Sequence, residues 1–158
     1  MPMRVVGVDL GRRQIGLALS DRSGTLATPW RTVRGGGSVP EVVGRLGAVL
    51  RKLSEDDDGL AGIVVGLPSH LDGRPHEHAV RVRAIAEALE LRTGLAVTLQ
   101  DERLTSVEAE QRLALRERDW RKRKARLDAA AAAIILQDYL DAQLGAREVR
   151  SQKAEDRS

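Results

Sequence analysis

Residues 4–21 have the sequence RVVGVDLGRRQIGLALSD and predict two β-strands joined by a tight turn. Residues 5–8, VVGV, are rich in β-branched apolar side chains, which suit a buried strand. In residues 15–19, IGLAL, large apolar residues alternate with small ones, and this period of two is typical of a second strand. Gly11 and Gly16 flank the polar turn, where glycine permits positive φ values and the close approach of a ligand. The stretch therefore predicts a hairpin that forms the first two strands of a β-sheet.

Asp9 stands at the end of the first predicted strand. A carboxylate that is buried there without a partner would cost several kcal/mol. It therefore needs a strong partner, and a metal ion is one candidate. The alternative is a plain hairpin with a solvated Asp9 at its tip.

The composition excludes several classes of protein. The chain has 158 residues, enough for one domain with a sizeable core, and 42% of them are hydrophobic, which excludes a disordered composition. It contains no cysteine, so a disulfide scaffold and a thiolate metal site are excluded. No stretch approaches the roughly 20 apolar residues of a membrane span, and we expect no signal peptide.

Positive charge is concentrated in one segment of the chain. The formal net charge of +3 is weak evidence for a polyanionic partner. The stronger evidence for such a partner is the cluster of cationic residues in 116–126, RERDWRKRKAR. Aromatic residues make up 2% of the chain, which argues against the base-stacking platforms of single-strand-binding proteins. Trp30, Trp120 and Tyr139 are the candidates for stacking.

The remaining elements follow from hydrophobic periodicity and from turn residues. Residues 34–38, RGGGS, lack the G-x-x-x-x-G-K-[ST] pattern of a phosphate-binding loop and predict a flexible connection. Five alanines follow Asp128 and give the last predicted helix a very high propensity. The predicted strands cover residues 25–33, 60–67 and 95–99, and the predicted helices cover residues 39–53, 77–93, 104–115 and 127–141, with the basic residues 116–126 interrupting the last two.

This order of elements predicts a mixed α/β domain. Short turns connect the first three strands, which are therefore expected to be antiparallel, whereas the later strands arrive through helical crossovers and are expected to be parallel. The result is a mixed five-stranded sheet with helices on both faces. We expect residues 1–144 to form this single domain and residues 145–158 to form a polar, disordered tail.

Acidic residues stand where the predicted strands end. Asp9 ends the first strand, and Asp101 and Glu102 follow the fifth. If these strands are parallel, their ends share the sheet edge at which α/β proteins bind ligands. The alanines after Asp128 would let the last helix lie close to the sheet, so that Asp128 projects toward Asp9. The sequence therefore predicts a patch of three or four carboxylates.

Such a patch has the chemistry of a site for a hard cation. Close carboxylates repel one another unless a cation neutralises them, and oxygen-only ligands suit Mg²⁺ or Mn²⁺. Two such ions about 4 Å apart can activate a water and stabilise the leaving oxygen in phosphodiester cleavage. Two of the acids also have a simpler explanation, because Asp128 suits a helix start and Asp101 could pair with Arg103.

Together these residues resemble the YqgF-type, or RuvX, family of Holliday-junction resolvases, also described as pre-ribosomal RNA nucleases with an RNase H-like fold. The resemblance covers about residues 4–141. It rests on GVDLGRRQIGLALSD, VVGLPSHLDG, DERLTSVEAE and the basic segment before LDAAAAAIILQDYLD, in this order. The most specific of the four is DERLTSVEAE.

The resemblance implies a metal-dependent nuclease whose catalytic and metal-binding acids are Asp9, Glu102 and Asp128. Asp101 would be a further ligand or would orient the others. The implied cofactor is Mg²⁺ or Mn²⁺, and cleavage would leave a 5′-phosphate and a 3′-hydroxyl. The family also implies a bacterial cytoplasmic protein in ribosomal RNA maturation, with a ribosomal precursor particle as a partner to be tested.

The loop VGLPSHLDG departs from the usual pattern of this family, because it carries Ser69 and His70. His70 could add a general acid or base, although a surface histidine is the simpler interpretation. His76 and His78 are expected to be solvated, because no third nitrogen ligand completes a zinc site.

Cationic residues near the predicted site are candidates for contacts with nucleic-acid phosphates, which position a substrate without reading its sequence. Trp120 could stack on a base or anchor its loop. The alternative for the basic cluster is a solvated charged face. The candidates are Arg12, Arg13, Arg103, Arg121, Lys122, Arg123 and Lys124.

Two other functions compete with the nuclease. The first is a nucleic-acid-binding scaffold in ribosome assembly with little catalysis, although intact Asp9, Glu102 and Asp128 argue against it. The second is a nucleotide-binding phosphotransferase, because D-L-G-x-x-x-x-G resembles the first phosphate loop of the actin and sugar-kinase group, but the sequence has no second loop. Symmetric junction resolution would require a homodimer, whereas RNA trimming would not.

Overall fold

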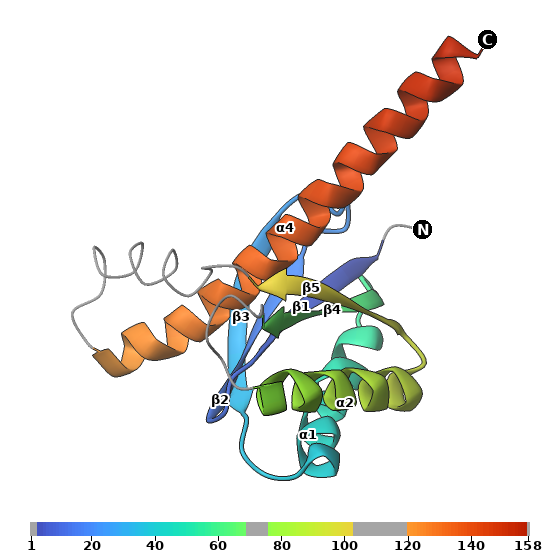
Figure 1. Ribbon diagram of the computed structural model, residues 1–158. Coiled ribbons are helices and arrows are strands. Elements are labelled where there is room, and N and C mark those ends of the chain that lie inside the picture. The colour runs from blue at the N-terminus through green and yellow to red at the C-terminus, as the bar shows by residue number, and fades with distance from the viewer. Residues whose placement is uncertain (1–2, 69–75, 103–119, 158) are drawn as a thin grey trace.

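The computed structural model describes residues 3–68, 76–102 and 120–157, and for residues 76 and 120–126 it describes the backbone alone (Figure 1). The predicted helix over residues 104–115 lies outside the described residues. In chain order the elements are β1 (Arg4–Leu10), β2 (Gln14–Ser20), β3 (Ala27–Arg34), α1 (Val39–Ser54), β4 (Leu60–Pro68), α2 (His76–Thr93), β5 (Ala96–Glu102) and α4 (Trp120–Asp156).

The five strands form one mixed sheet in the order β3-β2-β1-β4-β5. β1 pairs antiparallel with β2, and β2 pairs antiparallel with β3. β4 lies parallel to β1 and β5 lies parallel to β4, because α1 and α2 carry the chain back between them. The predicted mixed five-stranded sheet is confirmed. The carboxyl ends of β1, β4 and β5 share one edge.

The helices α1 and α2 cover one face of the sheet with large aliphatic side chains (Figure 1). Leu46 and Leu50 of α1 are fully buried against Val8 and its neighbours in the sheet. Ser38 caps α1, because its hydroxyl oxygen accepts a hydrogen bond of 3.3 Å from the Glu41 N–H. This face is a conventional core in which bulky side chains hold the helices away from the sheet.

The helix α4 crosses the opposite face and brings small residues against the sheet (Figure 1). On β1, a Cβ added to Gly7 would stand 2.7 Å from the Leu136 Cβ and 2.9 Å from the Ala132 carbonyl oxygen. Real Cβ atoms do not approach other atoms this closely, so the absence of a side chain at Gly7 lets α4 lie where it does. Helices therefore cover both faces, as predicted.

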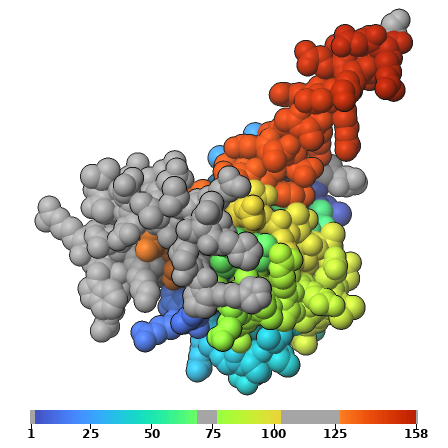
Figure 2. Space-filling model, viewed as in Figure 1, coloured from blue at the N-terminus to red at the C-terminus, as the bar shows by residue number. Residues whose placement is uncertain are grey.

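α4 is longer than the sequence predicted. We expected a helix over residues 127–141, an interrupting basic segment before it and a disordered tail from residue 145, but α4 begins at Trp120 and ends at Asp156. Residues 146–156 contain neither glycine nor proline, and one mid-helix glycine costs only about 1 kcal/mol. The end of α4 stands away from the rest of the described chain (Figure 2). Despite this length, α4 is not apolar enough to cross a membrane, and neither is any other described helix.

Candidate functional site

Asp9 lies in β1 on the face of the sheet that α4 covers. Side chains alternate along a strand, and those of Val8 and Leu10 are buried in the core under α1 and α2. The Asp9 side chain is half-buried, and the residue pairs with Gly16 of β2. Asp9 therefore faces α4 at the carboxyl end of the central strand.

Asp128 of α4 lies directly over that partner glycine. Its carbonyl oxygen is 1.9 Å from the point where a Cβ would stand on Gly16, and its carbonyl carbon is 2.3 Å from the same point. A backbone atom cannot rotate out of the way, so any side chain at this position would displace the helix. Because Gly16 is the register partner of Asp9, the absence of a side chain at Gly16 lets the backbone of α4 at Asp128 approach this pair of residues. The projection of the Asp128 side chain toward Asp9 stays a prediction.

Glu102 reaches the same face from the other side of β1. It ends β5, pairs with Pro68 of β4, and is buried with 3% of its surface exposed. Its Oε2 atom is 3.5 Å from the point where a Cβ would stand on Gly66. Val65, the preceding residue, pairs with Val8, so Gly66 lies level with Asp9 on the neighbouring strand.

Asp9, Glu102 and Asp128 therefore share one face and one edge of the sheet. Their oxygen donors are of the kind that Mg²⁺ and Mn²⁺ prefer. Within the described residues, however, no group of three or more acidic, histidine or cysteine side chains is arranged so that it could hold a metal ion. The donor chemistry fits a hard cation, whereas a closed ligand set is not formed, and the metal site stays a prediction.

Asp101 differs from these three acids. It pairs with Leu67 and is exposed. Because successive residues of a strand point to opposite faces, Asp101 emerges on the face opposite to Glu102. The sheet therefore separates it from the region between Asp9 and α4, and its role as a metal ligand stays a prediction.

The predicted phosphate-binding residues fall into two groups. Arg12 and Arg13 are exposed in the turn between β1 and β2, within a few residues of Asp9. The backbone of residues 120–126 forms the start of α4, ahead of Asp128, but these side chains lie outside the described residues. The same holds for Arg103 and for the candidate general acid His70. Of the other two histidines, His76 is described by its backbone alone, and His78 is half-buried rather than fully solvated.

Two glycines of the site were not recognised from the sequence as contact points for a helix or an acid. Gly16 lies under Asp128, and Gly66 lies under Ile135 of α4 with the Glu102 carboxylate next to it. A glycine inside a strand often marks a close approach by another backbone or a ligand. That signal was present at both positions, and it would have indicated which face of the sheet carries the site.

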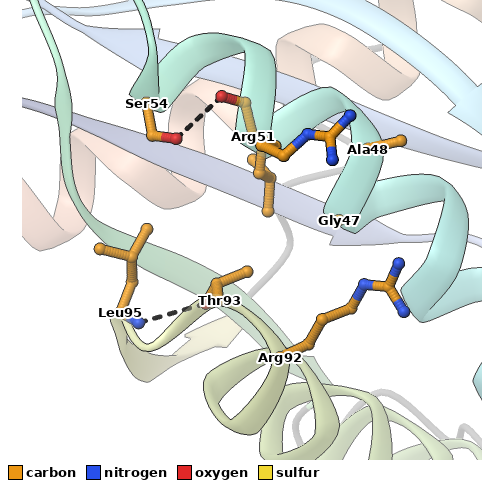
Figure 3. A pocket seen from close by; sticks show the side chains of 8 residues that line it. Gly47, Ala48, Arg51, Ser54, Arg92, Thr93 and Leu95 are labelled. Carbon is orange, nitrogen blue, oxygen red and sulfur yellow. Dashed lines mark hydrogen bonds between the residues drawn. The ribbon is translucent and has the colours of Figure 1, made fainter.

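A separate pocket of about 520 Å³ lies between α1 and the end of α2, at the opposite edge of the sheet (Figure 3). Arg51 and Arg92 line it, each in the last turn of its helix, where a cation interacts favourably with the helix dipole. The Thr93 hydroxyl donates to the Leu89 carbonyl oxygen at 2.7 Å and accepts from the Leu95 N–H at 3.2 Å. These polar groups cap the helix ends, and the pocket is not part of the candidate site.

The sequence matches the family model described as "RuvX: Holliday junction resolvase" over residues 3–142. The chain belongs to the RuvX family. A relative from Nocardioides sp. is 44% identical over 139 residues, which cover 86% of each chain. A relative from Anaeromyxobacter sp. is 43% identical over 139 residues, which cover 88% of this chain and 97% of the relative. Both carry the description "Putative pre-16S rRNA nuclease".

Among solved structures, the RuvX chain is similar to the T. thermophilus RuvC in complex with Holliday junction substrate. The TM-score is 0.54 at 20% identity, and the match covers 90% of this chain and 96% of that chain. A second T. thermophilus RuvC structure matches with a TM-score of 0.53 at 22% identity. At this level of identity the likeness concerns the fold, which is a RuvC-like RNase H fold.

Proposed function

We propose that this RuvX chain is a metal-dependent nuclease that hydrolyses phosphodiester bonds in precursors of 16S ribosomal RNA. In this proposal Asp9, Glu102 and Asp128 hold Mg²⁺ or Mn²⁺. The proposal is supported by the family and by one observation above all. The three acids come from three separate elements and lie on the same side of the sheet, next to strand positions that are occupied by glycine.

The described residues suit this chemistry in different ways. A bound divalent cation supplies a polarised water and stabilises the negative charge of the leaving oxygen. Asp9 belongs to β1 and Glu102 to β5, the two strands that flank β4 in one sheet, and this framework limits how far their carboxylates can move. The Glu102 carboxylate is buried, and a cation bound next to it would offset the charge of the carboxylate. Asp128 is carried by α4, so the position of this helix sets its distance from the other two acids.

The substrate proposal follows the relatives. The two curated relatives named above are described as acting on pre-16S rRNA, and they match most of this chain. Resolution of a four-way junction is the second substrate to test, because the family description names it. The two can be separated directly, since junction resolution requires two active sites acting together.

The decisive experiment compares Asp9→Asn with wild type on labelled pre-16S rRNA, single-stranded RNA, single-stranded DNA and a four-way junction, each with Mn²⁺ and with EDTA. We expect cleavage by the wild type that requires the metal and is lost in Asp9→Asn. Asp57→Asn is the matched control, because Asp57 is an exposed aspartate in the loop between α1 and β4, and it should cleave as the wild type does. The preferred substrate then decides between RNA processing and junction resolution.

Binding of Mn²⁺, followed by calorimetry in the absence of nucleic acid, gives a second readout. We expect Asp9→Asn and Glu102→Gln to weaken it while the far-ultraviolet circular dichroism stays unchanged. Equal cleavage by the wild type and Asp9→Asn would contradict the proposed metal site. Nucleic-acid binding without cleavage of any of these substrates would instead support a scaffold in ribosome assembly.

A further inference from the structure

The loop at residues 35–38 joins β3 to α1 and packs against the turn that follows Asp9. The Gly35 N–H donates to the Arg13 carbonyl oxygen at 2.9 Å. A Cβ on Gly35 would stand 2.7 Å from the Gly11 carbonyl oxygen. The close approach of the loop to the turn therefore depends on the absence of a side chain at Gly35. The loop that the sequence predicted as a flexible connection is therefore tied to the edge of the sheet that carries the candidate site.

Two arginines from the helices hold the next two residues of this loop. The Arg45 guanidinium donates to the Gly36 carbonyl oxygen, and the Arg81 guanidinium donates to the Gly37 carbonyl oxygen at 2.7 Å. Arg34 is exposed at the end of β3. We call the resulting region the glycine-loop surface, and its cationic residues are Arg12, Arg13, Arg34, Arg45 and Arg81.

This surface carries a large excess of positive charge. It includes an open hollow of about 610 Å³, which Arg34, Arg45 and the acid Glu41 help to line. One oxygen of the Glu41 carboxylate accepts a hydrogen bond of 3.1 Å from the Ser38 hydroxyl. The ion pairs that join two described residues do not include an arginine of the glycine-loop surface. Arg45 and Arg81 each use only some of their five N–H donors on backbone carbonyl oxygens, so the guanidinium groups of this surface keep N–H donors for an anionic partner.

The described part of this surface lacks the aromatic side chains that typically bind single-stranded nucleic acid. Proteins that bind single strands stack successive bases on aromatic side chains. The two aromatic side chains that the structure describes lie elsewhere, because Trp30 packs against the core and Tyr139 belongs to α4. Arginines on a framework of strand, turn and helices instead suit the regularly spaced phosphates of a double helix, which they contact without reading bases.

We infer that the glycine-loop surface binds the phosphate backbone of a double-helical stem next to the cleavage point. This inference rests on the proposed nuclease function, because the surface adjoins the strand end that carries Asp9. Duplex RNA and duplex DNA present the same phosphate chemistry, and the test has to separate them. The glycine-loop surface would hold the stem, and the acids would lie where the stem ends.

The test measures binding in EDTA, so that cleavage does not interfere. Fluorescence anisotropy compares a labelled RNA duplex, a DNA duplex and a single-stranded RNA of the same length over a range of salt concentrations. We expect the slope of log affinity against log salt to fall by about 0.9 for Arg34→Ala on the DNA duplex, because one phosphate contact is lost. Combined substitution of Arg34, Arg45 and Arg81 by alanine should lower it by about 2.7.

Two controls separate this effect from net charge and from misfolding. Arg150→Ala removes the same charge from the projecting end of α4, where the side chain is exposed, and it should leave duplex binding unchanged. Arg81→Lys keeps the charge, and it should retain most of the salt dependence that Arg81→Ala loses. The melting temperature of each variant shows whether the loop contacts survive.

The outcomes are distinct from those of the nuclease test. An unchanged slope in the triple variant, or an equal loss in Arg150→Ala, would overturn the inference while cleavage by the wild type could still be observed. An equal loss on single-stranded RNA would overturn the assignment to a stem. Loss of duplex binding in a protein that cleaves nothing would support the surface and contradict the nuclease. The stronger of the two duplexes identifies the kind of stem.

Discussion

The two faces of the sheet are packed in different ways. Under α1 and α2, large aliphatic residues such as Leu46 and Ile85 fill the space between helix and sheet. Under α4, alanines and strand glycines let backbone atoms of the helix come close to the strands, and the larger side chains of Ile135, Leu136 and Leu140 complete the contact. All three candidate acids belong to the second face.

The two kinds of packing are suited to two different roles, the positioning of an acidic residue and the stability of the fold. A core of large side chains tolerates small shifts of a helix, because neighbouring side chains can adjust. A helix backbone that rests on a bare strand has no such freedom, since its carbonyl groups cannot move aside. The α4 face therefore fixes Asp128 relative to Asp9, and the α1 and α2 face supplies stability. The predictions below test this division.

Gly16→Ala should have the largest effect. The new Cβ would collide with the Asp128 carbonyl oxygen, so α4 must shift. We expect the free energy of unfolding to fall by more than about 3 kcal/mol, the upper end for overpacked sites. Cleavage should fall about 100-fold, because a displacement of about 1 Å is enough to misplace a catalytic group. Urea unfolding and cleavage kinetics measure the two effects, and wild-type values of both would show that α4 does not rest on β2.

The sequence predicted the large aliphatic face well and the close-packed face less completely. Helical spacing of apolar residues located α1, and the strand ends located Asp9 and Glu102, because both signals are local. Because successive side chains of a strand point to opposite faces of the sheet, the sequence could also have predicted that Asp101 and Glu102 lie on different faces. The end of α4 could not be predicted from packing, since residues beyond its contact with the sheet are exposed and have no apolar stripe.

Leu46→Ala tests the aliphatic face. Leu46 is fully buried between α1 and the sheet, and truncation leaves a cavity there. We expect a loss of about 3.5 kcal/mol in the free energy of unfolding, the middle of the range for such truncations. Cleavage per folded molecule should stay at the wild-type level, because the acids lie on the other face. A large loss of cleavage at a temperature at which the variant is fully folded would contradict the division between the two faces.

Gly44→Ala is the counterpart of Gly16→Ala and should change the free energy of unfolding in the opposite direction. Gly44 lies within α1, its φ angle is not positive, and no atom lies within 4 Å of the point where its Cβ would stand. Alanine should therefore raise the free energy of unfolding by about 0.5 to 1 kcal/mol, through better helix propensity and a less flexible unfolded chain. An increase in melting temperature is the expected result, whereas a decrease would mean that α1 contacts something at this position.

Asp21→Asn should have the smallest effect, and the effect should depend on pH. The pKa of Asp21 is lowered from 3.8, first by the hydrogen bond from the Ser23 hydroxyl and then by the N–H groups of Thr25 and Leu26. A lowered pKa in the folded state means that the ionised carboxylate stabilises the turn above the unfolded pKa, and that this contribution is lost as the pH falls through the folded value. The urea midpoint of wild type should therefore exceed that of Asp21→Asn at pH 7, and the difference should shrink below about pH 4. This turn adjoins α4, because Gln137 donates to the Thr25 carbonyl oxygen and accepts from the Ala27 N–H, each at 2.9 Å. A difference that stays constant down to pH 3 would show that the carboxylate charge does not stabilise the turn on which this end of the α4 contact depends.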